Sequence, residues 1–365
     1  MLTRVLLALA VLFLAALPCG RCASLPESTA SPQERLHAFY YGWYGTPDVD
    51  GRWINWDHAV TTADGRVEST CAPPEDIGAN FYPASGPYSS SDLETAKRHC
   101  AEIQRAGVGV MVVSWWGKDT PTDRSLSSLF EAATDAGLKI CFHLEPWPDR
   151  DAESVRDALR YLLDRWGNAS ALFRWQGKPM VYVYDSYLVP DSEWASLLRP
   201  NGTRSIRGTP LDSLFIGLWV KESHGRSLAE AGFDGFYTYF ATEGFTWGST
   251  PEHWPEMARF ARDKNKLFIP CVGPGYNDLR IRPWNEKNHR GREGGAYFDR
   301  LFERAVAVNP GVIAITSYNE WHEGTQIEPA MPYRAVGRVY EDYGNLSGTW
   351  YLDRALYWRD KWLSP

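Results

Sequence analysis

Two carboxylates, Glu320 and Glu323, stand three positions apart in the part of the chain that is richest in reactive side chains. The surrounding run, residues 317–328, reads Ser-Tyr-Asn-Glu-Trp-His-Glu-Gly-Thr-Gln-Ile-Glu, and we call it the acidic loop. Carboxyl groups this close can act on one bound molecule. Hydrolysis of a glycosidic bond usually needs two of them, one that protonates the leaving oxygen and one that acts as base or nucleophile. A solvated acidic loop is the alternative, because most glutamates are surface charges.

The run before the acidic loop favours a catalytic pair of carboxylates over a solvated loop. Residues 312–316, Val-Ile-Ala-Ile-Thr, are mostly apolar and β-branched, a pattern that predicts a buried strand. The two glutamates then lie just past the carboxyl end of a strand, where (β/α)8 barrels carry their active-site loops. Trp321 and His322 add an apolar face and a hydrogen-bond donor, and a solvated loop seldom interleaves such residues after a core strand.

Eight strand-like runs alternate with helical patterns along the chain, which predicts a parallel sheet, and the count of eight predicts its closure. We therefore expect an α/β fold, a single (β/α)8 TIM-type barrel with long βα loops over residues 36–365. A doubly wound open sheet is the alternative, but no glycine fingerprint for a dinucleotide follows the first strand. The connection 46–92 is too long for a simple link, so we expect a functional loop with local structure. The predicted strands are 37–43, 108–115, 138–145, 180–185, 214–220, 235–239, 266–272 and 312–318, and the predicted helices are 91–106, 125–136, 152–165, 192–198, 223–231, 251–264, 297–308 and 350–363.

The strand ends supply further side chains that could bind a sugar. The chain holds 17 Trp and 19 Tyr, and aromatic rings stack on the C–H faces of sugars, although core packing is the commoner role of any one ring. Their recurrence at strand ends, together with carboxylates and an arginine, favours a carbohydrate cleft. We expect Glu145 to reach its mouth, with a salt-bridged structural role as the alternative, and we interpret His143 in the same strand as a core residue. The candidate binding residues are Tyr41, Tyr44, Trp116, Glu145, Tyr239 and Arg282.

A series of motifs runs through the chain in a fixed order. The longest is Asn-Glu-Trp-His-Glu-Gly-Thr-Gln-Ile-Glu at 319–328. The others are His-Ala-Phe-Tyr-Tyr-Gly-Trp-Tyr-Gly at 37–45, Phe-Tyr-Pro at 81–83, Phe-His-Leu-Glu-Pro at 142–146, Val-Tyr-Asp-Ser-Tyr at 183–187, Gly-Phe-Tyr-Thr-Tyr-Phe-Ala-Thr at 235–242, Val-Gly-Pro-Gly-Tyr at 272–276 and Ile-Arg-Pro-Trp-Asn at 281–285. Together they resemble the endo-α-1,2-mannosidases, glycoside hydrolase family 99. The long motif is specific, whereas the short ones would mean little alone.

The resemblance implies a retaining enzyme that cleaves internal α-mannosidic bonds of glucosylated high-mannose N-glycans without a metal or other cofactor. It implies that the 2-hydroxyl of the mannose is the nucleophile. Glu320 would take its proton, a 1,2-anhydro sugar would form, and Glu323 would serve first as acid and then as base. Such roles need environments that push the two pKa values apart. A glycosidase with a covalent Glu intermediate and a non-catalytic luminal mannose-glycan lectin are the alternatives, although a pure binder would not need an acid–base pair.

At Trp116 the chain departs from the animal members of that family. The resemblance implies that the residue after Ser114 and Trp115 lines the subsite for the sugar beyond the cleaved mannose, and that glucose-releasing animal enzymes commonly have Tyr there, followed by a longer loop. Trp offers a larger apolar face and no hydroxyl. We therefore expect the chain to accept mannose-capped as well as glucose-capped substrates.

The N-terminus predicts entry into the secretory pathway. Arg4 precedes a 13-residue apolar run, 5–17, which is typical of a signal peptide and short for a membrane span of about 20 residues. We expect a signal peptide or short signal anchor over 1–23, a polar linker over 24–35 and the barrel domain after it. The expected location is the Golgi lumen or outside the cell, and the family's animal members are anchored Golgi enzymes. Three N-glycosylation sequons agree with that route, and they begin at Asn168, Asn201 and Asn345.

The net charge and the cysteine content restrict the classes of molecule that we expect the chain to bind. The net charge of −7 argues against nucleic acid, and no Cys/His spacing resembles a zinc site. Cys71 and Cys100 could pair in an oxidising lumen, whereas Cys141 and Cys271 lie in strand-like runs and are expected to be buried thiols. We expect a mannose-rich N-glycan as the partner and contact with a membrane only through an N-terminal anchor. The sequence indicates no oligomeric state.

Overall fold

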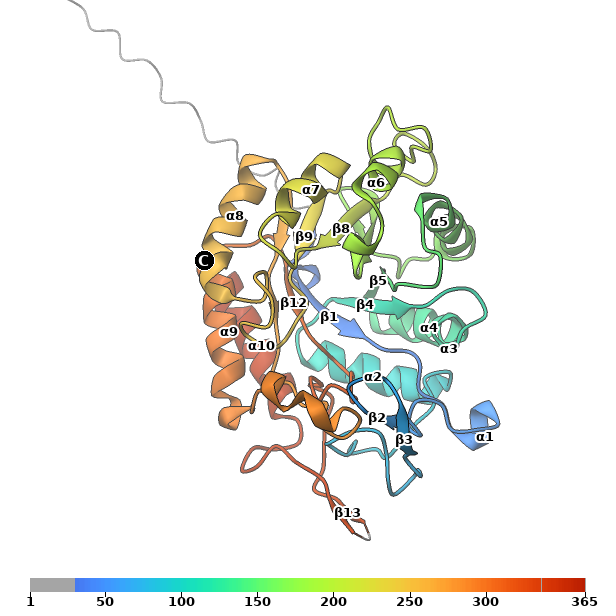
Figure 1. Ribbon diagram of the computed structural model, residues 1–365, viewed down its shortest axis with the longest axis vertical. Coiled ribbons are helices and arrows are strands. Elements are labelled where there is room, and N and C mark those ends of the chain that lie inside the picture. Colours follow the sequence, from blue (N-terminus) through green and yellow to red (C-terminus); the bar gives the residue numbers. More distant parts are fainter. Residues whose placement is uncertain (1–29, 336, 365) are drawn as a thin grey trace, which may run out of the picture.

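A ring of parallel strands forms the centre of the computed structural model, which describes residues 30–335 and 337–364 (Figure 1). The strands neighbour one another in the order β10-β9-β8-β7-β5-β4-β1-β12-β11, and each of these pairs is parallel. The predicted barrel is confirmed, and the open-sheet alternative is wrong. The ring strands are β1 (Leu36–Tyr40), β4 (Val110–Trp115), β5 (Lys139–Leu144), β7 (Lys178–Val183), β8 (Leu214–Leu218), β9 (Gly235–Tyr237), β10 (Leu267–Ile269), β11 (Cys271–Val272) and β12 (Ile313–Ile315).

The predicted seventh strand closes the ring although it is split in two. Pro270 separates β10 from β11, because proline has no backbone N–H to give to a neighbouring strand. β10 pairs with β9, whereas β11 pairs with β12. The carbonyl of Pro270 still accepts a hydrogen bond from Ala314 N at 3.1 Å. One continuous segment therefore joins the two edges of the sheet.

Helices cover the outside of the barrel, one after each strand of the ring except β10, which β11 follows directly (Figure 1). Local sequence sets their limits. The side chain of Asp92 accepts from Thr95 N at 2.9 Å at the start of α2, and Gly137 and Gly232, both with positive φ, end α4 and α7. Each predicted helix is confirmed to within a few residues. They are α2 (Leu93–Arg105), α4 (Leu126–Ala136), α5 (Ala152–Trp166), α6 (Asp191–Leu198), α7 (His224–Ala231), α8 (Trp254–Asp263), α9 (Ala296–Ala307) and α10 (Trp350–Leu363).

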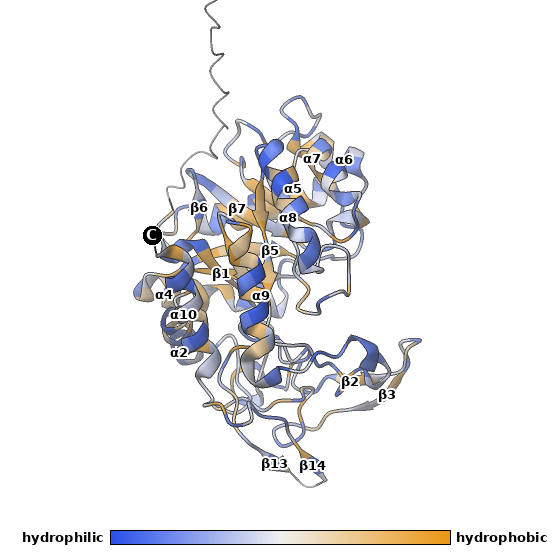
Figure 2. Cartoon of the chain, turned by 90° about the vertical axis from the view of Figure 1, so that its left-hand side faces the viewer, coloured by the Kyte–Doolittle hydropathy of each residue, from blue (hydrophilic) through white to orange (hydrophobic). Residues whose placement is uncertain are grey.

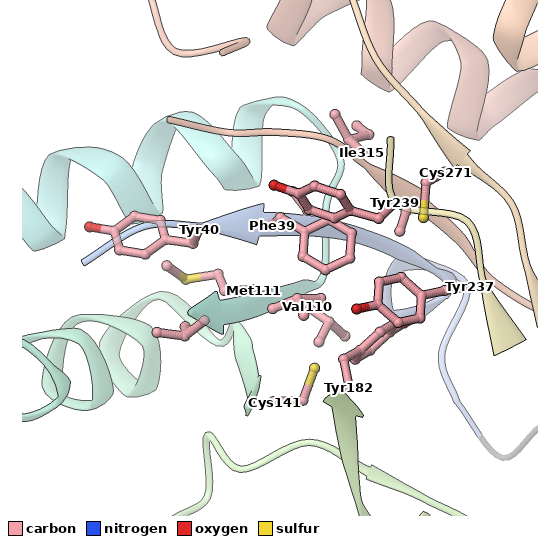
Figure 3. Close-up of a cluster of buried hydrophobic side chains, with 14 of the residues drawn as sticks. Phe39, Tyr40, Val110, Met111, Cys141, Tyr182, Tyr237, Tyr239, Cys271 and Ile315 are labelled. Atoms are coloured by element: carbon pink, nitrogen blue, oxygen red, sulfur yellow. The ribbon is translucent and has the colours of Figure 1, made fainter. Parts of the chain in front are cut away.

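Aromatic rings fill the inside of the barrel (Figure 3). Phe39 lies among Tyr239, Tyr182 and Tyr237, with ring centroids 5.1, 5.7 and 5.8 Å away. Buried phenol groups need partners, and the hydroxyl of Tyr182 contacts Nδ1 of His37 at 2.9 Å. The strands are apolar and the exposed helix faces are hydrophilic (Figure 2). The barrel is thus a packed core, and its loops carry the functional residues.

The long connection 46–92 has the local structure expected of it. It contains the short helix α1 (Pro47–Asp50) and an antiparallel hairpin of β2 (Ala59–Thr61) and β3 (Val67–Thr70). A second hairpin, β13 (Arg334–Ala335) and β14 (Arg338–Val339), follows the acidic loop. Both views place the two hairpins at the same end of the molecule (Figures 1 and 2). Smaller elements are η1 (Gln33–Arg35), α3 (Pro121–Arg124), β6 (Arg174–Trp175), η2 (Ser186–Leu188), η3 (Pro251–His253), η4 (Pro283–Asn288) and η5 (Glu293–Gly295).

The first described residues pack against the barrel. The predicted signal peptide, 1–23, and residues 24–29 of the predicted linker lie outside the described residues, so they stay predictions. Arg35, in the turn η1 at the end of that linker, donates to Gly311 O at 2.9 Å and to Pro310 O at 3.1 Å. Among the described helices none has the length and apolarity to cross a bilayer.

Every cysteine in the described part of the chain is a free, buried thiol. Cys141 and Cys271 are buried as expected. Cys71 and Cys100, whose pairing the sequence left open, are not joined. Burial raises the pKa of Cys71 to about 11 and that of Cys100 to about 12, so both stay protonated near neutral pH.

Candidate active site

The acidic loop folds back on itself just past the carboxyl end of β12. Ser317 N donates to Thr325 O and Ile327 N donates to Ser317 O, both at 2.9 Å. The hydroxyls of Ser317 and Thr325 contact each other at 2.8 Å. Glu320 and Trp321 are 3% and 0% exposed, so the loop is an ordered, buried structure, and the solvated-loop alternative is wrong.

A buried polar layer lies behind the acidic loop, and we call it the backing layer. Its centre is Glu328, which is 2% exposed. One carboxylate oxygen accepts from Tyr88 OH and from Trp321 Nε1, both at 2.8 Å, and the other lies 3.2 Å from His99 Nε2. Buried carboxylates are stable when their oxygens are satisfied in this way. The backing layer therefore fixes the part of the loop that carries the candidate pair.

The loop after β1 completes the backing layer. Asn319 binds both backbone groups of Tyr41: its Oδ1 accepts from the N–H at 2.7 Å, and its Nδ2 donates to the carbonyl at 2.9 Å. The hydroxyl of Tyr44 donates to Asn319 O at 3.2 Å and accepts from Trp321 N at 3.1 Å. Tyr44 is buried, with its ring 4.2 Å from that of Trp56. This candidate binding residue thus holds the acidic loop from behind.

Glu320 lies in the more enclosed of the two acidic environments. Its Oε1 accepts from His322 N at 3.1 Å and lies 3.4 Å from His322 Nδ1. The other ring nitrogen is 2.8 Å from Asn55 O, and a carbonyl only accepts, so Nε2 carries the proton and Nδ1 presents a lone pair. Burial lowers the pKa of His322 to about 3. Burial first, and then the charge of Glu323, raise the pKa of Glu320 well above its usual range.

Glu323 lies in a more open environment. A quarter of its side chain is exposed, and its Oε1 is 3.9 Å from Arg282 Nη1. Burial raises the pKa of Glu323 to about 7, although the guanidinium opposes the rise. The two carboxylates therefore differ in exposure and in neighbour, since a neutral imidazole faces one and a cation faces the other. Such unequal surroundings are what an acid–base pair requires.

The loop after β11 packs against the acidic loop. Asn277 N donates to Glu323 O at 2.7 Å. Gly324 adopts φ 63°, and a Cβ there would lie 2.8 Å from Asn277 O, so only glycine fits this contact. Arg282 reaches Glu323 from this loop, where Asp278 Oδ2 accepts from its Nη1 at 3.1 Å.

A cavity of about 430 Å³ opens beside Glu323. Arg282, Tyr239 and Tyr276 line its inner part, and Phe245 and Trp284, each 47% exposed, lie in its lining as well. Its size and its mixture of rings and polar groups suit a small organic ligand. The remaining lining residues are Tyr184, Phe240, Ala241, Thr242, Asn285, Lys287 and Asn288.

Glu145 is buried at the carboxyl end of β5. Its Oε1 accepts from Ser114 Oγ at 2.7 Å and lies 3.3 Å from His143 Nδ1. Burial raises the pKa of Glu145 to about 8 against the opposing bond from Ser114, and burial lowers that of His143 to about 3. The neighbours are thus neutral near pH 7 and form no salt bridge. A protonated Glu145 can donate to a sugar hydroxyl, and its ionised form would raise the pKa values of Tyr41 and Glu320.

A chain of aromatic rings runs outward from the candidate pair. The hydroxyls of Tyr41 and Tyr239 contact each other directly. The ring of Trp43 lies 4.9 Å from that of Tyr41 and 6.4 Å from that of Trp116. Trp116 is 38% exposed, so it ends the chain at the surface and offers an accessible ring for stacking.

The structure brings most of the predicted site residues together and separates two of them. Arg282 and Tyr239 line the cavity with Glu323, whereas Tyr44 lies behind the acidic loop and Trp116 lies at the surface. Sequence reasoning gave no site role to several participants, because residue types alone do not show which side chains meet. These are His143 and Ser114 beside Glu145, Asp278 beside Arg282, and the exposed rings of Phe245 and Trp284. Within residues 30–335 and 337–364, no group of three or more His, Cys, Asp and Glu could hold a metal ion.

Comparison with known proteins places this site in a family. A family model described as Glycosyl hydrolase family 99 matches residues 32–364. The glycoprotein endo-alpha-1,2-mannosidase of Xenopus laevis is 42% identical over 354 residues, which cover 92% of this chain and 79% of the relative. The glycoprotein endo-alpha-1,2-mannosidase-like protein of Homo sapiens is 41% identical over 345 residues, 90% of this chain and 76% of the relative.

A solved structure agrees with these matches. The GH99 endo-alpha-mannosidase from Bacteroides thetaiotaomicron superposes with a TM-score of 0.88 and 44% identity, and the match covers 90% of this chain and 97% of that one. Both the sequence and the barrel are therefore shared over nearly the whole described chain. This chain belongs to glycosyl hydrolase family 99 and is a glycoside hydrolase of its endo-alpha-mannosidase type.

Proposed function

We propose that the chain is a retaining endo-α-1,2-mannosidase that cleaves internal α-mannosidic bonds of high-mannose N-glycans, glucosylated ones included. The observation that carries the proposal is the pair Glu320 and Glu323 at the carboxyl end of β12. One carboxylate is enclosed beside a neutral imidazole, and the other faces a cavity beside a guanidinium. The names of the relatives, glycoprotein endo-alpha-1,2-mannosidase and its like protein, support the substrate class.

The proposed first step uses the 2-hydroxyl of the mannose as nucleophile. Glu320 takes the hydroxyl proton while O2 attacks C1, and the bond from C1 to the leaving oxygen breaks as Glu323 gives that oxygen its proton. The product on this side is a 1,2-anhydro sugar. In the second step Glu323 takes a proton from water and the water oxygen attacks C1. The C1–O2 bond breaks, and O2 recovers its proton from Glu320. Two displacements at C1 retain its configuration, and each carboxylate returns to its starting state.

The proton must lie on Glu323 when the reaction starts. In the empty site burial favours a proton on Glu320, because that carboxylate is the more enclosed and faces the lone pair of His322. A bound sugar reverses this preference. Its 2-hydroxyl donates to Glu320 and stabilises the ionised form, whereas exclusion of water from the cavity raises the pKa of Glu323 further.

We propose that the cavity binds the leaving side of the bond. Glu323, the proposed acid, lines it, and Arg282 and the rings of Phe245 and Trp284 lie beyond. Trp116 stands at the end of a different path, through Trp43 and Tyr41. The sugars before the cleaved bond would follow that path, and Trp116 would accept glucose or mannose as a capping sugar.

Product analysis tests the function. Defined glucosylated and unglucosylated high-mannose glycans are incubated with the protein, and we expect release of a disaccharide or a longer capped piece with retained anomeric configuration. Release of single mannose units, or of nothing while binding persists, would contradict the proposal. The second outcome is the one that a luminal mannose-glycan lectin predicts.

A 2-deoxy substrate analogue separates the two catalytic routes. A covalent glycosyl intermediate on a glutamate does not need the 2-hydroxyl, so continued turnover of the analogue would favour that route. We expect no turnover, because Glu320 then has no proton to take and no internal nucleophile forms.

The secretory pathway is the proposed location, in the Golgi lumen or outside the cell. The apolar run 5–17 and the sequons at Asn168, Asn201 and Asn345 support it, as does the glycoprotein substrate in the names of the relatives. We expect the mature chain to begin after about residue 20. An intact N-terminus in a carbonate-washed membrane pellet would favour a retained anchor instead.

A further inference from the structure

Asp278 is a buried carboxylate that the proposed reaction steps do not use. It is 1% exposed and lies in the loop after β11. Its Oδ2 accepts three hydrogen bonds, from Tyr276 OH at 2.9 Å, Asn285 Nδ2 at 2.8 Å and Arg282 Nη1 at 3.1 Å. All three donors line the cavity beside Glu323. One oxygen atom therefore fixes three of the side chains that line that cavity.

Arg282 is held between two carboxylates by this arrangement. Its Nη1 contacts Asp278 Oδ2 and also lies 3.9 Å from Glu323 Oε1. The backbone is fixed as well, since Arg282 N donates to Asp278 O at 2.8 Å. The side chain of Arg282 is 38% exposed, so an arginine without Asp278 would be free to turn toward solvent. Its position beside Glu323 thus depends on the buried aspartate.

The charges around Glu323 balance one another. The cation of Arg282 stabilises the ionised form of Glu323, and the anion of Asp278 destabilises it. Asp278 therefore acts in two opposite ways, because it brings the cation close and also partly neutralises it. The other titratable groups around Glu323 are the carboxyls of Glu320 and Glu145 and, in the lining of the same cavity, Lys287. The phenols around it are Tyr41, Tyr184, Tyr239 and Tyr276.

We propose that Asp278 is a positioning residue for the reaction: it holds Arg282 against Glu323 and thereby sets the pH range over which Glu323 acts as an acid. This inference rests on the acid role proposed for Glu323. A role limited to holding the loop is the alternative, and the substitution Asp278→Asn separates the two. An asparagine oxygen can accept the same three hydrogen bonds, but it carries no charge.

The experiment compares the pH dependence of kcat, which reports groups of the enzyme–substrate complex, where the proton is proposed to lie on Glu323. Asp278→Asn removes the anion and leaves the cation unopposed, so the pKa of Glu323 falls and the basic limb should move to lower pH by about one unit. Arg282→Met removes the cation, so the basic limb should move to higher pH. Opposite shifts in the two variants support the proposal. A basic limb that stays in place in both variants overturns it, whatever the loss of rate.

The matched control is the same substitution at an aspartate that binds an arginine outside the site. Asp299 in α9 also binds an arginine, since its two oxygens accept from Arg354 Nε and Nη2 at 2.5 and 2.7 Å. Asp299→Asn should lower stability without moving the pH profile. If Asp278→Asn does not fold, Arg282→Met decides: an upward shift supports the proposal, and an unchanged basic limb overturns it.

A titration without substrate separates this inference from the proposed function. The ¹³C signal of the Glu323 carboxyl, assigned by its loss in Glu323→Gln, is followed against pH in the wild type and in both variants. Opposite shifts of its midpoint support the inference even where product analysis contradicts the mannosidase. Equal midpoints in all three proteins overturn the inference even where the enzyme cleaves mannosides.

Discussion

The backing layer is buried and hydrogen-bonded, whereas the side chains at the outside of the site are exposed. We call these outer side chains, Trp116, Phe245 and Trp284, the rim. Behind the acidic loop, Glu328 is 2% exposed and binds three neighbours. On the rim, the rings of Trp116, Phe245 and Trp284 are 38%, 47% and 47% exposed. The comparison teaches that buried hydrogen bonds fix the reacting groups, because an unmet polar partner in the interior is expensive. Exposed rings can change at little cost and so adjust which sugars bind.

The largest expected effect comes from the carboxylates that the backing layer holds. Glu323→Gln should reduce cleavage of natural glycans by about 10²–10⁴-fold or more, because one residue serves as acid and as base. Glu320→Gln should also lose activity, and an activated aryl leaving group should not rescue it, since the 2-hydroxyl still lacks its base. Rates with glycan and aryl substrates are measured beside circular dichroism and glycan binding, which should be retained. A Glu323→Gln rate within tenfold of the wild-type rate would show that Glu323 is not the catalytic acid and base.

A substitution inside the backing layer should damage stability and activity together. Glu328→Met has a similar size but removes the oxygen that Tyr88 OH and Trp321 Nε1 share as acceptor, so the free energy of unfolding should fall by about 3 kcal/mol. The loop should then lose its geometry, and kcat should fall. Phe245→Ala on the rim is the control, and it should change stability little. Urea unfolding and kcat are measured for both variants. Equal losses would show that the buried layer contributes no more to stability and activity than the exposed rim does.

The buried acids should also make stability depend on pH. The pKa of Glu145 is about 8 in the folded chain, against a usual value of 4.5, so the folded state binds its proton more tightly than the unfolded state does. Its contribution is therefore complete below about pH 4.5 and is lost as the pH rises toward 8, by at most about 1.4 kcal/mol per unit. Glu145→Gln cannot titrate, so its unfolding free energy should fall less steeply across this window.

The control for this titration is an exposed carboxylate. Glu94 in α2 has a side chain that is 78% exposed, and Glu94→Gln should leave the slope of stability against pH unchanged. Urea unfolding from pH 4.5 to 8 gives all three slopes. Parallel curves for Glu145→Gln and the wild type would show that Glu145 does not titrate as its burial predicts.

The smallest expected effect lies on the rim. Trp116→Tyr introduces a phenol hydroxyl that can form a hydrogen bond with a hydroxyl of the capping sugar. Such a hydrogen bond contributes about 0.5–1.5 kcal/mol net. The ratio of kcat/KM for glucosyl-mannose over mannosyl-mannose substrates should therefore rise severalfold, with stability unchanged. An unaltered ratio would show that Trp116 does not set the preference. Trp284→Tyr, on the other side of the site, should leave this ratio as it is.

Much of the architecture was readable from local patterns. Alternating apolar runs and helical patterns predicted the barrel, and the run 312–316 before Glu320 and Glu323 placed the pair at a strand end. Both inferences rest on short-range chemistry, because strand periodicity and chain order decide which loops share one end of a barrel. The same reasoning gave Arg282 and Tyr239, which line one cavity with Glu323.

The sequence by itself determined the fold class, the family and the acidic pair, since each depends on residue types and their order. Tertiary structure alone decided what each neighbour does. Tyr44, expected at the sugar, contacts Asn319 behind the acidic loop, and His143 is buried in the core as expected but also lies beside Glu145. Asp278 stands out only because folding brings Tyr276, Arg282 and Asn285 to a single oxygen. Roles of this kind depend on the distances between side chains and on their burial, and a linear pattern does not contain either.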